Sequence, residues 1–458
     1  MPKITVIGGG SVHWMPTIVR DLAVTDGLGR SHIVLEDIEP AHLDATLPMA
    51  RRILDQAGTG CTVEATSDQR AALDGADYVI LTISTGGLDA MRHDLEIPEK
   101  YGIFQSVGDT VGPGGIARAL RNIPVVVGIA RDMEALCPDA WLLNYTNPLS
   151  TLCRCVTRTT GIRVIGLCHE IRGCFRLLRE IFGVETDDRF EWRVAGVNHL
   201  IFLLELRLDG EDAFPRLREF IRDHPLFDDK TLPPSSPLYP FQDRAGLKFK
   251  LSKTFGALPA SGDRHVAEFF PDVLTRDTGW GRKYGIELTR ISHRRALRRE
   301  AFERAARLAS GEETIDLAPS NEAAARIIGA LVRGDEYTDV VNLPNTGQIT
   351  NLPADAIVET RATVKGGAVA AEHIDELSPA IQSVLAHHVR VQEMTVEAAL
   401  TGNRSLALQA FFLDPLIRQA EAHERLFDEL LDAHHDHLPQ FFGDPEPLLA
   451  KARAALTA

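Results

Sequence analysis

The sequence has no apolar run long enough to cross a membrane, and Met1-Pro2-Lys3 leads directly into a predicted strand without a signal-peptide pattern. We therefore expect a cytoplasmic protein with no membrane partner. An excess of basic residues is also lacking, because 49 Lys and Arg face 64 Asp and Glu, giving a formal net charge of -15. Such a chain repels phosphate backbones, which argues against general nucleic-acid binding. A small anionic substrate in a locally positive site is compatible with this charge.

Cysteine is scarce, and the spacing of the six residues shows no paired zinc-type pattern. A cytosolic chain of 458 residues does not need disulfides, because it is long enough to bury two or three packed lobes. At least one thiol is therefore free to act as a ligand. The cysteines are Cys61, Cys137, Cys153, Cys155, Cys168 and Cys174.

The first residues predict a nucleotide-binding turn. A strand at residues 4–7 runs into Gly8-Gly9-Gly10-Ser11, and a helical pattern follows. Glycines at such a turn let the backbone approach a pyrophosphate, whose charge the helix N-terminus stabilises. We expect Gly8, Gly10 and Ser11 to contact the cofactor. The usual third glycine is missing, since His13 holds its place, and on its own the run could be a flexible loop.

Two further strands strengthen the prediction. Residues 33–38 form an apolar run that ends in Glu36-Asp37, and residues 77–83 form another that ends at a Gly86-Gly87 turn. A carboxylate at Asp37 would accept hydrogen bonds from the adenosine ribose and would disfavour the extra phosphate of NADP. We therefore predict an α/β fold, with an N-terminal Rossmann doubly wound sheet that binds NAD over residues 1–195.

Three later stretches place polar side chains after predicted strands or in tight turns. Asp109 lies in a turn-rich loop at residues 104–116, where its simplest alternative is a turn or cap residue. Asn147 follows a strand at residues 140–143 and could hold sugar hydroxyls. Residues 164–167 form an apolar run that delivers Cys168, His169 and Glu170 at the edge where open α/β sheets bind ligands. A core cysteine followed by two surface residues is the alternative there.

Residues 196–458 predict a second, mixed α+β domain. It begins with a strand at residues 200–208, contains a turn-rich motif at residues 342–353, and ends with a helical pattern at residues 406–431 that Pro415 interrupts. A proline cluster at residues 233–237 is typical of a surface segment. The predicted helix at residues 290–310 is rich in Arg and Glu. The simplest interpretation of these charges is a solvent-exposed helix face.

Taken together, the motifs resemble the NAD-dependent family 4 glycoside hydrolases. The likeness is spread in the same order over most of the chain, through residues 7–11, 101–120, 144–148, 166–170, 196–199, 258–265 and 342–353. The resemblance implies net hydrolysis without the usual carboxylate pair. The family reaction is a transient oxidation at C3 of the sugar, loss of the C2 proton, elimination of the aglycone, addition of water and return of the hydride.

The resemblance also implies residue roles. Cys168 and His199 match the family's metal ligands, and the implied metal is Mn²⁺, although thiolate and imidazole by themselves favour zinc or iron. Asp109 would protonate the leaving group, and Asn147 would hold hydroxyls beside the metal. Asp263 matches the proposed C2 base of the α-glycosidase branch. The candidates kept in reserve for this base are His265 and Tyr145.

The run Cys168-His169-Glu170 most resembles the α-galacturonidase-like subgroup. His169 is then a substrate contact, and Arg264 or Arg92 could bind the sugar carboxylate with two hydrogen bonds, with surface ion pairing as the alternative. Neutral α-galactosides, α-glucosides and sulfoquinovosides remain alternative substrates. Family members form dimers or tetramers. Two other hypotheses are an NAD-dependent 2-hydroxyacid dehydrogenase and a sugar- or NAD-sensing protein without catalysis.

Overall fold

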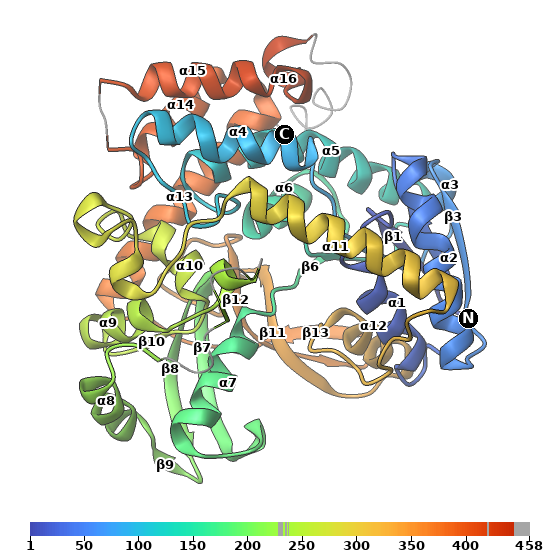
Figure 1. Cartoon of the computed structure of the whole chain (residues 1–458), viewed down its shortest axis with the longest axis horizontal. Helices are drawn as coiled ribbons and strands as arrows, with labels where there is room; N and C mark the ends of the chain where they lie inside the picture. The colour runs from blue at the N-terminus through green and yellow to red at the C-terminus, as the bar shows by residue number, and fades with distance from the viewer. Residues whose placement is uncertain (228–231, 234–235, 237, 419–420, 444–458) are drawn as a thin grey trace.

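The structure is a computed structural model that describes residues 1–227, 232–233, 236, 238–418 and 421–443, so most of the predicted proline-rich segment lies outside the described residues. The first six strands are parallel and lie in the order β3-β2-β1-β4-β5-β6, which is the doubly wound order. The predicted Rossmann sheet is thus confirmed (Figure 1). The strands are β1 (Lys3–Ile7), β2 (His32–Glu36), β3 (Thr62–Thr66), β4 (Tyr78–Leu81), β5 (Trp141–Asn144) and β6 (Arg163–Gly166).

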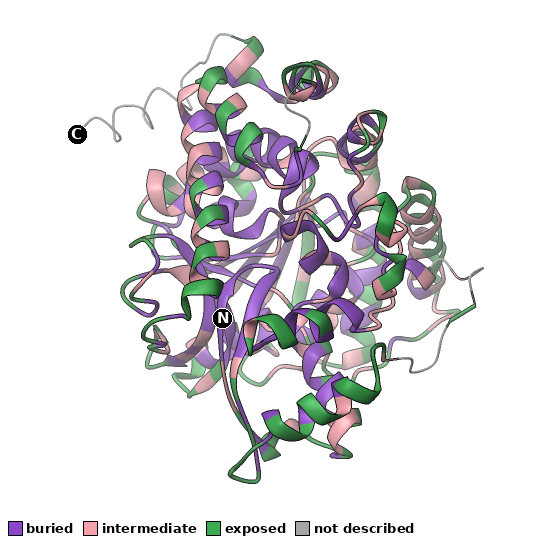
Figure 2. Cartoon of the chain, turned by 90° about the vertical axis from the view of Figure 1, so that its left-hand side faces the viewer, coloured by how far each residue is buried: buried purple, intermediate pink, exposed green. Residues whose placement is uncertain are grey.

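Helices cover both faces of this sheet, because its strands carry apolar side chains on both sides. On β4, Val79 and Leu81 pack into one core and Ile80 packs into the other, as the alternation of a strand requires. Figure 2 shows the buried strands inside helices whose outer faces are exposed. The helices of this half are α1 (Met15–Val24), α2 (Pro40–Ala57), α3 (Gln69–Leu73), α4 (Gly87–Lys100), α5 (Gly112–Leu136), α6 (Leu149–Thr159) and α7 (Glu170–Phe182).

The second half extends the same sheet with antiparallel strands. Strand β11 pairs with β6 through Asn342 and Gly166, and the path continues β11-β12-β7-β8-β10. The two halves therefore share one 13-stranded sheet. The predicted boundary after residue 195 lies inside one of its strands, β7. The added strands are β7 (Phe190–Val197), β8 (Leu200–Leu208), β9 (Glu211–Asp212), β10 (Leu258–Pro259), β11 (Tyr337–Pro344), β12 (Ile357–Lys365) and β13 (Ala368–Ala371).

The remaining helices pack around this extension and back onto the first half. The predicted break near Pro415 separates α14 from α15, and α13 packs on α5 and α6. These helices are α8 (Phe214–Asp223), α9 (Gly246–Phe255), α10 (Asp263–Val266), α11 (Ile291–Ser310), α12 (Ala324–Arg333), α13 (Pro379–Thr401), α14 (Arg404–Leu413), α15 (His423–Ala433) and α16 (Pro439–Phe442). Within the described part of the chain, no helix has both the length and the apolar character needed to cross a bilayer.

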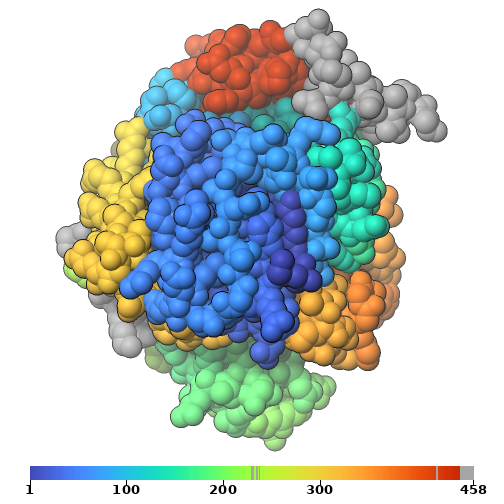
Figure 3. Space-filling view, turned by 90° about the vertical axis from the view of Figure 1, so that its right-hand side faces the viewer, coloured from blue at the N-terminus to red at the C-terminus, as the bar shows by residue number. Residues whose placement is uncertain are grey.

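Helix α11 belongs to the second half but lies against the nucleotide-binding half. Its residues Ala305 and Leu308 share a core with Ile53 and Leu54 of α2. Figure 3 shows the segment around residue 300 beside the surface formed by the first 100 residues. Arg298 and Arg295 bond His42 and Asp89 at the starts of α2 and α4, so the helix runs along the carboxyl-terminal side of the strands, where a ligand of this fold is expected.

Candidate active site

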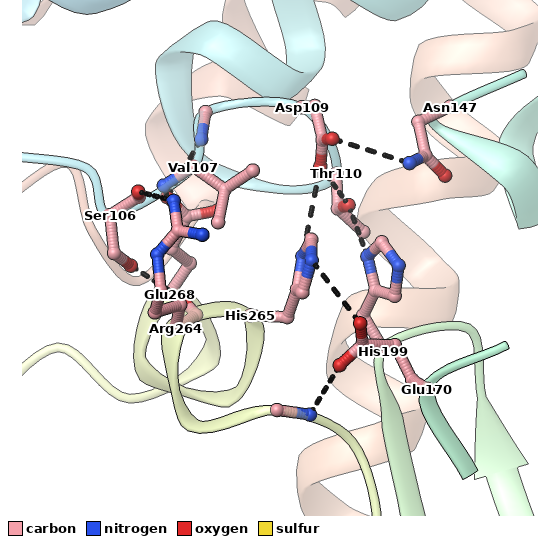
Figure 4. Close-up of polar contacts among 12 residues, drawn as sticks. Ser106, Val107, Asp109, Thr110, Asn147, Glu170, His199, Arg264, His265 and Glu268 are labelled. Carbon is pink, nitrogen blue, oxygen red and sulfur yellow. Dashed lines mark hydrogen bonds and ion pairs between the residues drawn. The ribbon is translucent and has the colours of Figure 1, made fainter. Parts of the chain in front are cut away.

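The predicted site residues come from elements that end at one edge of the sheet. Asn147 follows β5, Cys168 follows β6, and His199 lies in the turn that joins β7 to β8. Asp109 comes from the loop before α5, and His265 comes from the short helix α10. Figure 4 shows Asp109, His199 and His265 converging from these three elements.

Asp109, His199 and His265 each offer a ligand atom within 4.8 Å of the other two. The Nδ1 atom of His265 lies 3.9 Å from Oδ1 of Asp109, and its Nε2 lies 4.0 Å from Oε1 of Glu170. The two imidazole ring centroids are 3.6 Å apart, with an interplanar angle of 32°. Oxygen and imidazole nitrogen are ligands of divalent cations such as Mn²⁺, so the cluster fits a metal ion.

His199 has an unusual backbone. It occupies the turn between Val197 and Leu200 with φ of 67°, in the left-handed region that non-glycine residues rarely adopt. This conformation costs about 1 kcal/mol or more and is typical of residues retained for function. Its Nδ1 lies 2.7 Å from the hydroxyl of Thr110, which fixes the ring and leaves Nε2 for another partner.

The electrostatics of the cluster favour neutral imidazoles beside an ionised carboxylate. Burial lowers the pKa of His199 to about 3 and that of His265 to about 4, against the opposing effect of Asp109. Burial acts to raise the pKa of Asp109, but His265, His199 and Arg118 together hold it well below its usual range. The buried Nδ1 of His265 has no hydrogen-bond partner. The site therefore offers free imidazole lone pairs and one anion at neutral pH.

The loop before α5 is rigid because buried side chains bond its backbone. One oxygen of Glu268 accepts the amides of Val107 at 2.7 Å and Gly108 at 2.8 Å. The Asp109 oxygens accept the Thr110 hydroxyl at 2.7 Å and Nδ2 of Asn147 at 3.2 Å. Asp109 thus bonds neighbouring site residues and is not a helix cap.

Two side chains of α5 fix the backbone of Asn147. Its carbonyl accepts Nε of Arg118 and Nδ2 of Asn122, each at 3.1 Å. Its buried Oδ1 has no hydrogen-bond partner. A buried amide oxygen without a donor is costly unless a ligand supplies one, so this atom is suited to accept a sugar hydroxyl.

Cys168 does not belong to the three-ligand cluster, and the acids near its thiol are Glu359 and Glu170. Burial, then Glu359 and Glu170, raise the pKa of its thiol well above the usual value, and Asn198 opposes this rise. Burial also raises the pKa of Glu359 to about 8. The side chains of Asn198 and Asn342 lie near Glu359 but do not reach hydrogen-bonding geometry.

Asp263 is bonded elsewhere. Its two oxygens accept the amides of Leu247 at 2.7 Å and Lys248 at 2.9 Å, in the first turn of α9. Burial, together with Asp243, raises its pKa. His265, two residues later on the same helical turn, faces Asp109 instead.

The two arginines proposed for the sugar carboxylate are separated. Arg264 donates to the carbonyl of Ser106 at 2.9 Å and to the hydroxyl of Thr289, while its guanidinium lies 4.6 Å from the Phe241 ring centroid. Arg92 lies on the surface of α4 and pairs with Glu96 at 3.5 Å. The structure therefore brings Arg264 to the site and leaves Arg92 outside it.

His169 and Tyr145 belong to a neighbouring group. Nδ1 of His169 lies 3.2 Å from Glu322, which is the first cause of its raised pKa. The Tyr145 hydroxyl accepts the amide of Ala324 at 3.1 Å, and its ring lies 5.7 Å from that of Trp14. His169 is half-exposed at this edge, 6.3 Å from the same Trp14 ring.

The glycine turn fits a dinucleotide. Gly8 has φ of 90°, and a Cβ there would lie 2.1 Å from the Thr82 carbonyl oxygen. The Gly10 amide donates to Asp37 at 3.0 Å, which places the predicted ribose acceptor beside the turn. The amide of Ser11 donates to the Gly8 carbonyl at 3.1 Å and closes the turn, and α1 begins at Met15.

A Rossmann turn in the same sheet as a cluster of imidazoles and a carboxylate is typical of enzymes of the cofactor-binding α/β class. The model of the family 4 glycosyl hydrolases matches residues 3–184, and that of the family's C-terminal domain matches residues 194–417. The chain therefore belongs to family 4 of the glycosyl hydrolases.

Curated relatives cover nearly the whole chain. An alpha-galacturonidase of Bacillus subtilis is 36% identical over 94% of this chain and 96% of its own length. An alpha-galactosidase of the same organism is 33% identical over 96% of this chain and all of its own length.

Solved structures agree with the fold. A putative glucosidase, lplD, of Bacillus subtilis has a TM-score of 0.88 and 34% identity, covering 94% of this chain and 100% of that one. A 6-phospho-beta glucosidase of Thermotoga maritima, solved with manganese, NAD⁺ and glucose-6-phosphate, has a TM-score of 0.78 and 24% identity. The match covers 95% of this chain and 99% of that one.

Some residues of the site carry no recognisable signal in the sequence. Thr110 and Glu170 lie inside motifs whose neighbours were predicted, but nothing in the sequence shows that they contact His199 and His265. Glu268 and Glu359 are buried acids in otherwise ordinary stretches. Arg294 lies in the arginine-rich helix α11, and its inward position follows only from the helical stripe it shares with Ala305 and Leu308.

Proposed function

We propose that this glycosidase cleaves α-glycosides, with α-D-galacturonides as its substrate, and that it uses NAD⁺ and a divalent cation, Mn²⁺ by preference. The curated relatives that act on α-galacturonides and α-galactosides support the substrate class. The related structure with manganese and NAD⁺ supports the cofactors through its shared fold.

The observation that carries the proposal is the position of two kinds of site at one sheet edge. The glycine turn with Asp37 lies after β1 and β2, and the cluster of Asp109, His199 and His265 contacts Asn147 and Glu170, which follow β5 and β6. A sugar held by the cluster would therefore face a nicotinamide bound at the turn. A simple hydrolase would need no such turn.

We assign the cation to Asp109 and His199, with Cys168 as the third ligand from the family resemblance. When bound, NAD⁺ accepts and returns a hydride and the cation stabilises negative charge on the sugar oxygens. Asn147 would hold a hydroxyl through its free Oδ1, next to Asp109. The depressed pKa of Asp109 favours a group that stays ionised over one that protonates the leaving group.

His265 is our choice for the base at C2 of the sugar. Its low pKa keeps it neutral, so that Nδ1 or Nε2 can accept a proton. Asp109 and Glu170, at 3.9 and 4.0 Å, would stabilise the imidazolium that forms. Asp263 stays the second candidate, although the amides of α9 occupy both of its oxygens.

The test is hydrolysis of the 4-nitrophenyl α-galacturonide, α-galactoside, α-glucoside and α-sulfoquinovoside, each with NAD⁺ and Mn²⁺ in D₂O. We expect the galacturonide to release 4-nitrophenol fastest, with deuterium at C2 of the freed sugar. Faster release from a neutral α-glycoside would make that sugar the substrate. Stoichiometric NADH without release would support a dehydrogenase, and full activity after removal of both cofactors would contradict the proposal.

We propose further that the enzyme acts in the cytoplasm as a homodimer or homotetramer, as the family resemblance implies. Light scattering of the purified protein, coupled to size exclusion, measures the assembly. A monomeric mass would contradict this part of the proposal.

A further inference from the structure

Arg294, on α11, has a guanidinium without an ionic partner. Within the described residues it forms no side-chain hydrogen bond or salt bridge, and its buried Nε has no hydrogen-bond acceptor. Its neighbours along the chain differ, because Arg290, just before α11, pairs with Glu99, and Arg295 pairs with Asp89. A partly buried guanidinium without an anion is costly, so its position is best explained by a ligand that supplies one.

The guanidinium is positioned at the site. Its Cζ atom lies 4.8 Å from the Phe241 ring centroid, and the Arg264 Cζ lies 4.6 Å from the same ring. Stacking on an aromatic ring fixes a planar guanidinium and leaves its edge free for hydrogen bonds. Arg264 uses Nη2 on both Ser106 and Thr289, although its own buried Nε has no acceptor, whereas no donor of the Arg294 guanidinium is bonded within the described residues.

The surrounding charges place Arg294 beside the cluster. Burial is the main cause that lowers its pKa, and Asp109 is the acid that opposes this effect. Arg294 in turn lowers the pKa of His265 and of Arg264. These effects agree with the contact to Phe241, which Arg294 shares with Arg264, the residue next to His265.

We infer that Arg294 recognises the carboxylate of a uronic acid substrate and determines specificity for it. The inference rests on the proposed function. A sugar whose C2 and C3 face His265 and Asp109 carries its C5 substituent on the opposite side of the ring. A planar carboxylate there matches the fork of a guanidinium, which can bind it with two charge-assisted hydrogen bonds. Neutral galactosides lack this group, so Arg294 would distinguish the two sugars.

A phosphate of the cofactor is another anion with oxygen acceptors. Arg294 also lowers the pKa of His13, which follows the glycine turn. The substrate is favoured because Arg294 stacks on Phe241 and lies near Arg264 and His265, all from the second half of the chain. The experiment separates the two sources by measuring NAD⁺ affinity together with glycoside preference.

The test compares Arg294→Met and Arg294→Lys with wild type and with Arg295→Met, a control on the exposed side of α11. The kcat/KM ratio of 4-nitrophenyl α-D-galacturonide to the α-galactoside is measured, with the dissociation constants of NAD⁺, D-galacturonate and D-galactose. We expect Arg294→Met to lower the ratio on the order of 100-fold through the galacturonide alone. Arg294→Lys should recover part of the ratio, and NAD⁺ affinity should not change.

Three outcomes would overturn the inference. An equal fall for both glycosides would make Arg294 a general site residue, and weaker NAD⁺ binding with an unchanged ratio would assign it to the cofactor. Should wild type cleave neither glycoside, the proposed function fails, and the binding constants still decide the role of Arg294. Loss of a wild-type preference for galacturonate over galactose in Arg294→Met would then support the inference, and its retention, or no preference at all, would overturn it.

Discussion

His265 and Asp263 lie on the same short helix but face different partners. Nδ1 of His265 lies 3.9 Å from Asp109, whereas both Asp263 oxygens accept amides of α9 at 2.7 and 2.9 Å. One side chain therefore contacts the candidate site and the other stabilises the start of a neighbouring helix. This difference separates the effects that their substitution should have.

His265→Asn should remove C2 exchange while retaining the cation. General-base catalysis contributes about 100-fold to 10,000-fold, so turnover should fall within that range. Deuterium incorporation in D₂O and Mn²⁺ affinity by electron paramagnetic resonance measure the two effects. Loss of Mn²⁺ binding would make His265 a metal ligand, as its place in the three-residue cluster also allows.

Asp263→Asn should act mainly on stability. The variant keeps one acceptor oxygen for the two amides of α9, so the free energy of unfolding should fall by about 1 kcal/mol, as for a lost helix cap. Chemical denaturation measures this change. Loss of C2 exchange with unchanged stability would instead restore Asp263 as the base.

Glu268→Gln should flatten the dependence of stability on pH. Burial raises the pKa of Glu268 from 4.5 to about 8, although the amides of Val107 and Gly108 oppose the rise. The folded state therefore retains a proton that the unfolded state loses above pH 4.5. Folded stability falls by up to about 1.4 kcal/mol per pH unit as pH rises toward 8.

Glutamine removes this loss, because its Oε1 can still accept both amides. The free energy of unfolding of Glu268→Gln should therefore exceed that of wild type more at pH 8 than at pH 5. Denaturant titrations across this range make the measurement, with Glu303→Gln on the exposed side of α11 as control. An unchanged pH slope would show that Glu268 is ionised in the folded protein.

Short apolar runs bounded by glycine or asparagine made the first half of the fold predictable. Strands β1, β2, β4, β5 and β6 all coincide with predicted runs, because strands buried on both faces carry a strong local signal. The single sheet was not predictable, since β6 and β11 meet through one pair, Asn342 and Gly166, far apart in the sequence.

The site was predictable by motif but not by orientation. The family resemblance points to residues 258–265, yet which of Asp263 and His265 faces Asp109 depends on a rotation within one helical turn. The position of Arg294 could not be predicted from the sequence for a different reason. It lies among many arginines, and only the packing of α11 on α2 shows which of them faces inward.

Cys168→Ser should weaken Mn²⁺ binding. It should also remove most of the increase in Mn²⁺ affinity with rising pH. Burial and Glu359 raise the pKa of the thiol, so cation binding must release its proton. Below that pKa the apparent affinity should rise about tenfold per pH unit in wild type but not in the variant. Mn²⁺ titrations from pH 6 to 9 measure this. The control is Cys61→Ser, because the Cys61 thiol bonds the Leu28 carbonyl. Equal Mn²⁺ affinities for Cys168→Ser and wild type would exclude Cys168 as a ligand.

Asp37→Ala should weaken NAD⁺ binding and relax its preference over NADP⁺. One carboxylate oxygen bonds the Gly10 amide at 3.0 Å, and we expect the carboxylate to accept the ribose hydroxyls of a bound dinucleotide. Loss of a hydrogen bond to a charged acceptor costs about 1.5 to 3 kcal/mol, so the dissociation constant for NAD⁺ should rise about 10-fold to 100-fold. NADP⁺ should bind relatively better, because the repulsion of its extra phosphate is removed. Titration calorimetry with both dinucleotides measures the ratio, with Glu39→Ala on the exposed start of α2 as control. An unchanged ratio would place the adenosine ribose away from Asp37.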